Sequence, residues 1–197
     1  MIKLIFVRHG QTKKNFDGLY CGWSDDDLTE EGENQAKVVA EKLKEEKITK
    51  IYASNLKRTM QTAKMINKYH EVKIISKENL REMNFGLWEG KKYSELKSEY
   101  EKDLSKWEKD WIHFIVPQGE NLMNMYERVC KEMERIIDEN KEGTFLVVAH
   151  AGCIRAILSR FIGIGIEDYW KYKVENCKIA SIEILEDGFS VLTGLNI

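Results

Sequence analysis

Short apolar runs alternate with longer amphipathic stretches along this chain, and that alternation limits the folds it can adopt. Four runs have the length and composition of buried strands, and apolar residues spaced three and four apart predict helices between them. The predicted strands are residues 3–7, 50–54, 72–75 and 144–150. Strands that alternate with helices predict an α/β fold with a largely parallel central sheet.

The helices are predicted from signals at their ends and from their apolar faces. One helix follows residues 50–54, where Ser54 is a candidate cap. Two long helices are predicted between the third and fourth strands, over residues 93–111 and after Asn121, with Pro117 separating them. The remaining predicted elements are helices from about Thr29 and at residues 152–162, and an antiparallel hairpin of residues 180–185 and 190–195 that turns at Asp187-Gly188.

The composition is that of a globular protein without a strong overall charge. The chain has 197 residues, 43% hydrophobic and 32% charged, with a formal net charge of −2. This balance argues against nucleic acid or an anionic membrane as a partner. The apolar run at the N-terminus is too short for a signal-peptide core and no run is long enough to span a bilayer, so we expect a cytoplasmic protein. A homodimer remains open.

Two strands end in a histidine followed closely by a glycine. His9 follows residues 3–7 in "VRHG", and His150 ends the most apolar strand in "VVAHAG". Because ligands bind beyond the carboxyl ends of parallel strands, we expect both histidines at one edge of the sheet. The other predicted strands also lead to polar groups: Arg58 in "SNLKRTMQTA" and Glu82 in "LREMNFGLWEG".

Four motifs in this order resemble the histidine phosphatase superfamily, which includes phosphoglycerate mutases and many small phosphatases. The motifs are R-H-G-x-T, S-x-L-x-R-T-x-Q-T-A, L-R-E-x-x-F-G-x-W-E-G and V-x-A-H-x-G, spread from Val7 to about Arg155. The resemblance implies a three-layer sandwich of the phosphoglycerate mutase type, with helices on both faces of a mostly parallel sheet. It also implies one domain over residues 1–197, with a small helical cap insertion around 84–120.

The resemblance implies a mechanism through a phosphohistidine. His9 would attack phosphorus through a neutral ring nitrogen, while Arg8 and Arg58 bind the phosphoryl oxygens, since a guanidinium matches their geometry. His150 would add a hydrogen bond to the transferring group. Glu82 would protonate the leaving alkoxide and later accept a proton from the attacking water.

Further residues, in these motifs and in the loop after residues 3–7, are candidates for binding the substrate. Thr12 and Asn15 lie in the loop behind the nucleophile as phosphate or framework donors. The other candidates are Gly22, Trp23 and Ala151.

Other interpretations of the candidate residues are less specific. A lone histidine at a strand end is often structural, and Glu82 could form an ion pair with Arg81. A zinc site built from His9, His150 and Glu82 is rejected, because no H-E-x-x-H spacing is present and the adjacent arginines would repel a dication. We therefore expect neither a metal nor a cofactor. A phosphate-binding module without turnover is the alternative of another class, and the complete catalytic set argues against it.

The substrate is expected to be a small phosphate ester. Within the superfamily the chain resembles the alpha-ribazole phosphatases of cobalamin biosynthesis, through "LYCGWSDDDLTEEG", "LREMNFGLWEG", "WEKDWIHFIVPQGEN" and "YKVENCKIASIEI". Trp107 and Trp111 could form walls for a flat base or merely attach their helix to the core. Asp27 replaces a proline common in relatives, and Ala151 replaces a common glycine. A phosphatase of broad specificity and a phosphoglycerate mutase remain alternatives.

Overall fold

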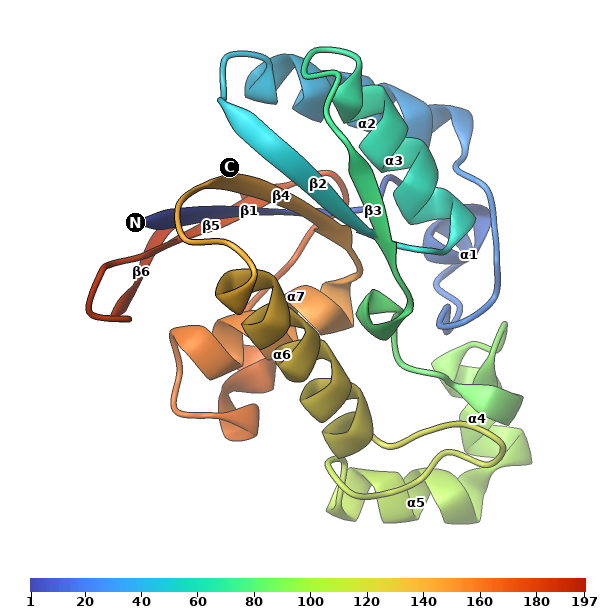
Figure 1. Cartoon of the computed structure of the whole chain (residues 1–197). Helices are drawn as coiled ribbons and strands as arrows, with labels where there is room; N and C mark the ends of the chain where they lie inside the picture. Colours follow the sequence, from blue (N-terminus) through green and yellow to red (C-terminus); the bar gives the residue numbers. More distant parts are fainter.

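A six-stranded mixed sheet forms the centre of the molecule, in a computed structural model that describes all 197 residues (Figure 1). The strands are β1 (Ile2–Arg8), β2 (Ile48–Ser54), β3 (Ile74–Lys77), β4 (Gly143–Ala149), β5 (Ile179–Ile184) and β6 (Ser190–Leu195). Their order is β3-β2-β4-β1-β5-β6. The strands from β3 to β1 are parallel, whereas β5 and β6 form an antiparallel hairpin beside β1. The predicted mostly parallel sheet is confirmed.

Helices cover both faces of this sheet, which makes three layers (Figure 1). They are α1 (Lys13–Asp17), α2 (Glu30–Leu43), α3 (Lys57–Asn67), α4 (Tyr93–Glu99), α5 (Glu101–Lys109), α6 (Leu122–Asp138) and α7 (Ala151–Phe161). Alternate residues of a strand point to opposite faces. In β1, Ile5 and Val7 therefore join the core beneath α2 and α3, whereas Leu4 and Phe6 join the core beneath α6 and α7.

The predicted helix over residues 93–111 is wrong in its continuity. The chain forms α4 and α5 instead, because Tyr100 leaves the helical region with φ −129° and ψ 32°. Glu101 and Asp103 lie in the first turn of α5, where the helix dipole favours negative charge. No glycine or proline marks this break in the sequence. Since α5 ends at Lys109, Trp111 does not share a helix face with Trp107.

Two local predictions near β2 and β3 also need correction. Ser54 does not cap α3, whose N-cap is Leu56 without a side-chain hydrogen bond. β3 begins two residues later than predicted, because the backbone N–H and carbonyl of Val72 both bond to the side chain of Asn67 instead of to a neighbouring strand. The predicted hairpin at Gly188 is confirmed, with a positive φ of 84° at that residue.

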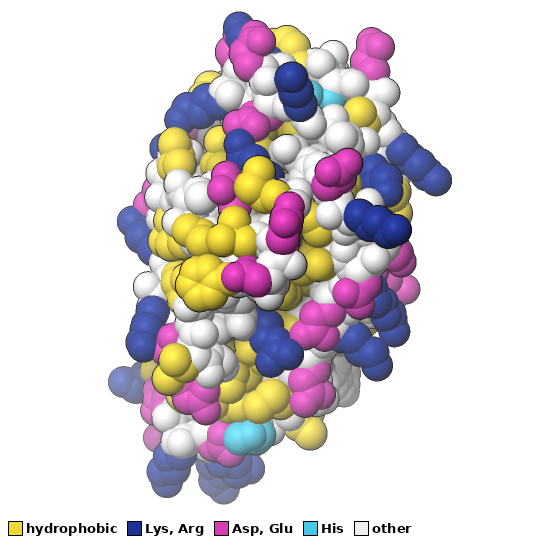
Figure 2. Space-filling view, turned by 60° about the vertical axis from the view of Figure 1, so that its left-hand side comes forward, with side chains coloured by type: hydrophobic (Ala, Val, Ile, Leu, Met, Phe, Trp, Pro, Cys, Tyr) yellow, Lys and Arg dark blue, Asp and Glu magenta, His cyan; other side chains and the backbone are white.

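The outer surface carries charges of both signs. Figure 2 shows Lys and Arg side chains interspersed with Asp and Glu over one face, rather than gathered into a single basic patch. No helix of the molecule is long and apolar enough to cross a membrane. The segment 84–120 holds α4 and α5 next to the start of α6 (Figure 1), and its function as a cap stays a prediction.

Candidate active site

The sheet brings the two predicted histidines together. β1 and β4 are neighbouring parallel strands that pair Arg8 with Ala149, so His9 and His150 follow at the same edge. Their ring centroids are 5.1 Å apart, with the planes inclined at 63°. Both residues are buried, at 3% and 0% exposure. This juxtaposition is the one that the two strand ends predicted.

The ring of His9 is held in one tautomer. Its Nδ1 lies 2.7 Å from the carbonyl oxygen of Gly10, so this nitrogen carries the proton and donates it. Its Nε2 accepts a hydrogen bond from Nε of Arg58 at 3.2 Å. Burial, followed by the charges of Arg58 and Arg8, keeps the pKa of His9 well below its usual value. His9 is therefore a neutral imidazole with a lone pair on Nε2.

Arg58 connects both histidines to the loop that follows β1. It lies in the first turn of α3 and is fully buried. Its Nη1 donates to the carbonyl of Ser24 at 2.6 Å, and its Nη2 donates to the carbonyl of Gly22 at 2.6 Å. Nη2 also lies 3.1 Å from Nδ1 of His150. One guanidinium thus organises the centre of the site.

His150 is fixed from its other side by Ser54, at the carboxyl end of β2. Its Nε2 lies 3.0 Å from Oγ of Ser54. Because Nδ1 faces a donor, Arg58, the proton belongs on Nε2, which donates it to Ser54. Burial and the charge of Arg58 hold the pKa of His150 well below its usual value. Ser54 thus orients a histidine at the strand end instead of capping the next helix.

Arg8 supplies a second cation to the same edge. Its Nη1 donates to the carbonyl of Val174 at 2.9 Å, while its Nε is buried without a hydrogen-bond partner. Burial lowers the pKa of Arg8, and the charge of Glu82 opposes that shift. No group of three or more His, Cys, Asp or Glu side chains is placed to hold a metal ion. The donors at this edge suit an anionic oxygen.

The carboxylate of Glu82 lies at the N-terminus of α7. Its Oε2 accepts from the backbone N–H of Gly152 at 2.9 Å, and its Oε1 accepts from Met83 N at 3.0 Å. A Cβ at position 152 would stand 2.0 Å from Oε1 and 2.8 Å from the hydroxyl oxygen of Tyr169. Glycine is therefore required for Glu82 to reach the backbone N–H at the start of α7.

Thr12 and Asn15 form the N-terminal cap of α1. The Thr12 hydroxyl accepts from Asn15 N at 3.3 Å, and Asn15 Oδ1 accepts from Thr12 N at 3.2 Å. Asn176, which the sequence analysis missed, donates to the carbonyl of His9 at 2.8 Å and to Asn15 Oδ1 at 3.4 Å. Thr12 thus belongs to the framework, and Asn15 links that framework to the chain next to His9.

The backbone of Gly22 and Trp23 is held by the carboxylate of Glu89, which the sequence analysis did not single out. The two Glu89 oxygens accept from Gly22 N at 3.0 Å and from Trp23 N at 2.6 Å. The indole of Trp23 donates to the carbonyl of Glu82 at 2.8 Å and lies 4.9 Å from the guanidinium of Arg81. Ala151 is the first residue of α7 and is half-buried. Trp23 therefore contacts the backbone that carries the candidate acid.

An apolar pocket of about 80 Å³ adjoins the acid side of the site. Met83 and Tyr169 connect it to Glu82, since Met83 is the next residue and the Tyr169 hydroxyl lies beside Gly152. All eight lining residues are hydrophobic: Tyr20, Met83, Phe85, Trp107, Trp111, Leu122, Tyr169 and Trp170. Trp107 and Trp111 both face this pocket although they do not share a helix.

Comparison with known proteins agrees with the motifs and the geometry. The model of the histidine phosphatase superfamily (branch 1) matches residues 4–196. Phosphoserine phosphatase 1 of Hydrogenobacter thermophilus is 32% identical over 197 residues, which cover 100% of this chain and 93% of the relative. The structure of the alpha-ribazole phosphatase from Shigella flexneri matches with a TM-score of 0.93 and 30% identity over 99% of this chain and 96% of that one. The phosphoglycerate mutase from Bacillus anthracis matches with a TM-score of 0.83 and 26% identity over 99% and 92% of the two chains.

The chain therefore belongs to the histidine phosphatase superfamily, and its fold is that of the phosphoglycerate mutase-like members. The family resemblance of the motifs is confirmed, and with it the general assignment as a phosphatase. The similar proteins bear names for different esters at comparable identity, so the substrate does not follow from the likeness.

Proposed function

We propose that the protein is a metal-independent phosphomonoesterase that acts through a phosphohistidine at His9. Nε2 of His9 forms a bond to phosphorus as the bond from phosphorus to the ester oxygen breaks. Glu82 gives a proton to the departing alkoxide, then accepts one from the water that attacks the phosphohistidine. Arg8 and Arg58 stabilise the charge on the three remaining oxygens. The hydrogen bond predicted from His150 requires its Nε2 proton to turn from Ser54 to the phosphoryl group.

The state of His9 is the observation that carries this proposal. A buried, neutral imidazole with its lone pair beside a guanidinium is a nucleophile held next to a group that binds phosphoryl oxygens. A histidine that served only to bind an anion would be more effective in its charged form.

Rapid quenching tests the covalent step. Wild-type protein mixed with a radiolabelled phosphate ester in chelator should retain label that is labile in acid and stable in base, on the peptide containing His9. The His9→Ala variant should retain none. Turnover without any labelled protein would overturn the phosphohistidine, and an absence of both label and turnover on every ester would favour a binding module.

For the substrate, we propose alpha-ribazole phosphate, whose alcohol carries a flat aromatic base. The support is the apolar pocket next to Glu82, because the leaving group must lie on the side of the residue that protonates it. Trp111 and Trp170 lie at this pocket with ring centroids 6.0 Å apart. Aromatic walls favour a flat apolar group over a small charged one.

A comparison of kcat/KM for alpha-ribazole phosphate, phosphoserine and the phosphoglycerates tests this substrate. We expect a preference of at least about 100-fold for alpha-ribazole phosphate, equivalent to roughly 2.7 kcal/mol. The Trp111→Leu variant should lower this preference by about 10-fold, with phosphoserine as its internal control. Equal rates across the panel would leave a phosphatase of broad specificity, and phosphate transfer between the phosphoglycerate positions would indicate a mutase.

The position of Arg155 supports the alternative of a phosphatase of broad specificity. The guanidinium of Arg155 lies 5.8 Å from the ring of Tyr169 and 5.1 Å from the ring of Trp170, at the edge of the same pocket. Its charge also acts on Arg8. A cation at this place suits esters that carry a carboxylate, and the Arg155→Met variant should then lose activity on phosphoserine more than on alpha-ribazole phosphate.

A further inference from the structure

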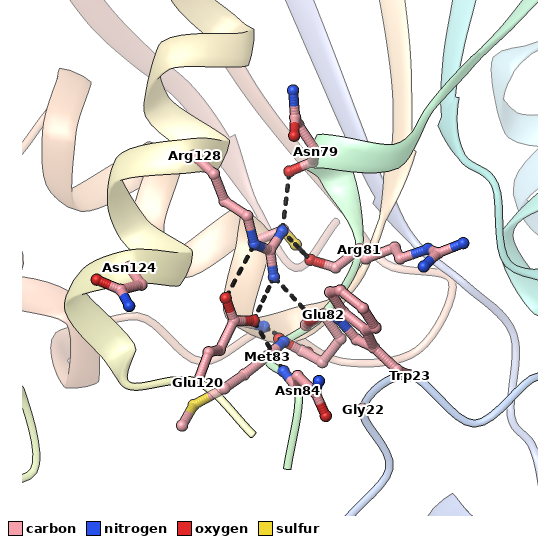
Figure 3. Close-up of polar contacts among 12 residues, drawn as sticks. Gly22, Trp23, Asn79, Arg81, Glu82, Met83, Asn84, Glu120, Asn124 and Arg128 are labelled. Atoms are coloured by element: carbon pink, nitrogen blue, oxygen red, sulfur yellow. Dashed lines mark hydrogen bonds and ion pairs between the residues drawn. The ribbon is translucent and has the colours of Figure 1, made fainter. Parts of the chain in front are cut away.

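The loop that carries Glu82 has no regular secondary structure between Arg81 and Phe85. A catalytic acid must keep its place within a fraction of an ångström, so a loop of this kind needs external support. The support comes from one arginine on α6 (Figure 3). The sequence analysis gave this residue no role.

Arg128 uses every N–H of its guanidinium on the Glu82 loop and on one carboxylate. Nη1 donates to the carbonyls of Asn79 and Arg81 at 2.9 Å and 2.7 Å, and Nη2 donates to the carbonyl of Glu82 at 2.8 Å. Nε and Nη2 donate to the two oxygens of Glu120, at 3.1 Å and 2.6 Å. A guanidinium has five N–H donors, and these five bonds employ all of them.

Glu120 holds the chain on the C-terminal side of Glu82. Its Oε1 accepts from the backbone N–H of Asn84 at 2.8 Å, so one ion pair holds the chain both before and after Glu82. The Glu82 carbonyl receives a second donor, the indole N–H of Trp23 (Figure 3). The side chains of Arg128 and Glu120 are only 19% and 15% exposed, where such bonds are less weakened by water.

We propose that Arg128, together with Glu120, is the positioning residue for the acid of the reaction. It does not touch the phosphate. It fixes the backbone from which the Glu82 side chain reaches the N-terminus of α7 and the leaving oxygen. This inference rests on the proposed function, because it takes Glu82 as the proton donor.

The leaving group of the substrate separates this positioning role from a purely structural one. An alkoxide needs a proton as it departs, whereas para-nitrophenolate is a stable anion and needs almost none. Both esters give the same phosphohistidine, whose hydrolysis also uses Glu82, so the two esters are compared by kcat/KM, which reports the steps up to departure of the alcohol. Loss of a positioned acid should lower kcat/KM for alkyl phosphates and spare that for para-nitrophenyl phosphate. A general loss of folded protein would slow both equally.

The test compares Arg128→Lys with wild type on an alkyl phosphate and on para-nitrophenyl phosphate. Lysine keeps the charge but has three donors and no planar fork. We expect kcat/KM on the alkyl ester to fall by about 10-fold or more, with less than about 3-fold on the aryl ester. Arg135→Lys is the matched control, since Arg135 lies on the same helix at 53% exposure and only pairs with Glu132.

A double variant, Arg128→Lys combined with Glu82→Gln, tests whether Arg128 acts through Glu82. When Glu82 is already glutamine, adding Arg128→Lys should cause no further loss on the alkyl ester, because the group it positions is gone. If Arg128→Lys folds poorly, Glu120→Gln replaces it with the same expectation. Equal losses on both esters, or a full further loss in the Glu82→Gln background, would overturn the positioning role. If Glu82→Gln alone lowers kcat/KM equally for both esters, the acid assignment itself fails, whatever Arg128 does.

Discussion

The site has two halves that are built in different ways. In the phosphoryl half, Arg8, His9 and His150 lie at or directly after strand ends, and Arg58 lies in the first turn of α3. Here side chains contact side chains in a buried cluster. In the acid half, Glu82 lies in an irregular loop, and its place depends on backbone groups held by α6, α7 and Trp23.

The two halves of the site should respond differently to amino-acid substitution. A residue at the end of a central strand moves only if the sheet moves, so a substitution in the phosphoryl half removes a chemical group and little else. A residue in a loop depends on the side chains that hold the loop. Distant substitutions should therefore displace Glu82 and leave His9 in place.

The strongest test of the phosphoryl half is removal of the nucleophile. His9→Ala deletes the atom that bonds to phosphorus, and we expect kcat to fall by roughly 10⁴-fold or more on both alkyl and aryl esters. Steady-state rates on the two esters measure this loss, and circular dichroism checks that the fold is retained. A loss confined to the alkyl ester would mean that the two halves are not distinct.

Removal of the acid should have a smaller effect that depends on the leaving group. Glu82→Gln keeps a hydrogen-bond acceptor for the N–H of Gly152 but cannot give up a proton in the same way. We expect kcat/KM on an alkyl phosphate to fall by about 10²- to 10⁴-fold, with a much smaller loss on para-nitrophenyl phosphate. A loss of equal size on both esters would assign Glu82 to phosphate binding or to structure.

A methyl group at Gly152 tests whether the acid half can be disturbed without touching the acid. In Gly152→Ala, the new Cβ would stand 2.0 Å from Oε1 of Glu82 and would force the carboxylate away from the helix end. We expect kcat/KM to fall by about 10-fold on alkyl esters, comparable to the effect of Arg128→Lys, with little change on aryl esters. Lys37→Ala is the control, since Lys37 is an exposed residue of α2, a helix on the other face of the sheet from α7. Unchanged alkyl rates would contradict the placement of Glu82.

The two halves also differ in how well the sequence predicts them. His9 and His150 could be predicted to meet, because strand ends in a parallel sheet converge on one edge whatever the rest of the chain does. Arg128 could not, since it lies 46 residues after Glu82 on a helix whose charged residues mostly face solvent. The break at Tyr100 also escaped prediction, because the apolar spacing continues through it and no glycine or proline marks it.

The last and smallest expected effect concerns stability against pH. Burial keeps His9 and His150 neutral in the folded protein and lowers their pKa well below usual, whereas in the unfolded chain each takes up a proton near pH 6.5. As pH falls below about 6.5, the unfolded state therefore binds more protons than the folded state, and the free energy of unfolding decreases by up to about 1.4 kcal/mol per pH unit for each histidine.

The difference in Tm between about pH 7.5 and pH 5.5 should be larger for wild type than for His150→Gln, which removes one of these groups. Glu82→Gln serves as the comparison from the acid half and should leave the histidine contribution intact. An equal drop in Tm for wild type and His150→Gln would show that the phosphoryl half admits a proton without loss of the fold, which contradicts a site held together by two neutral rings around Arg58.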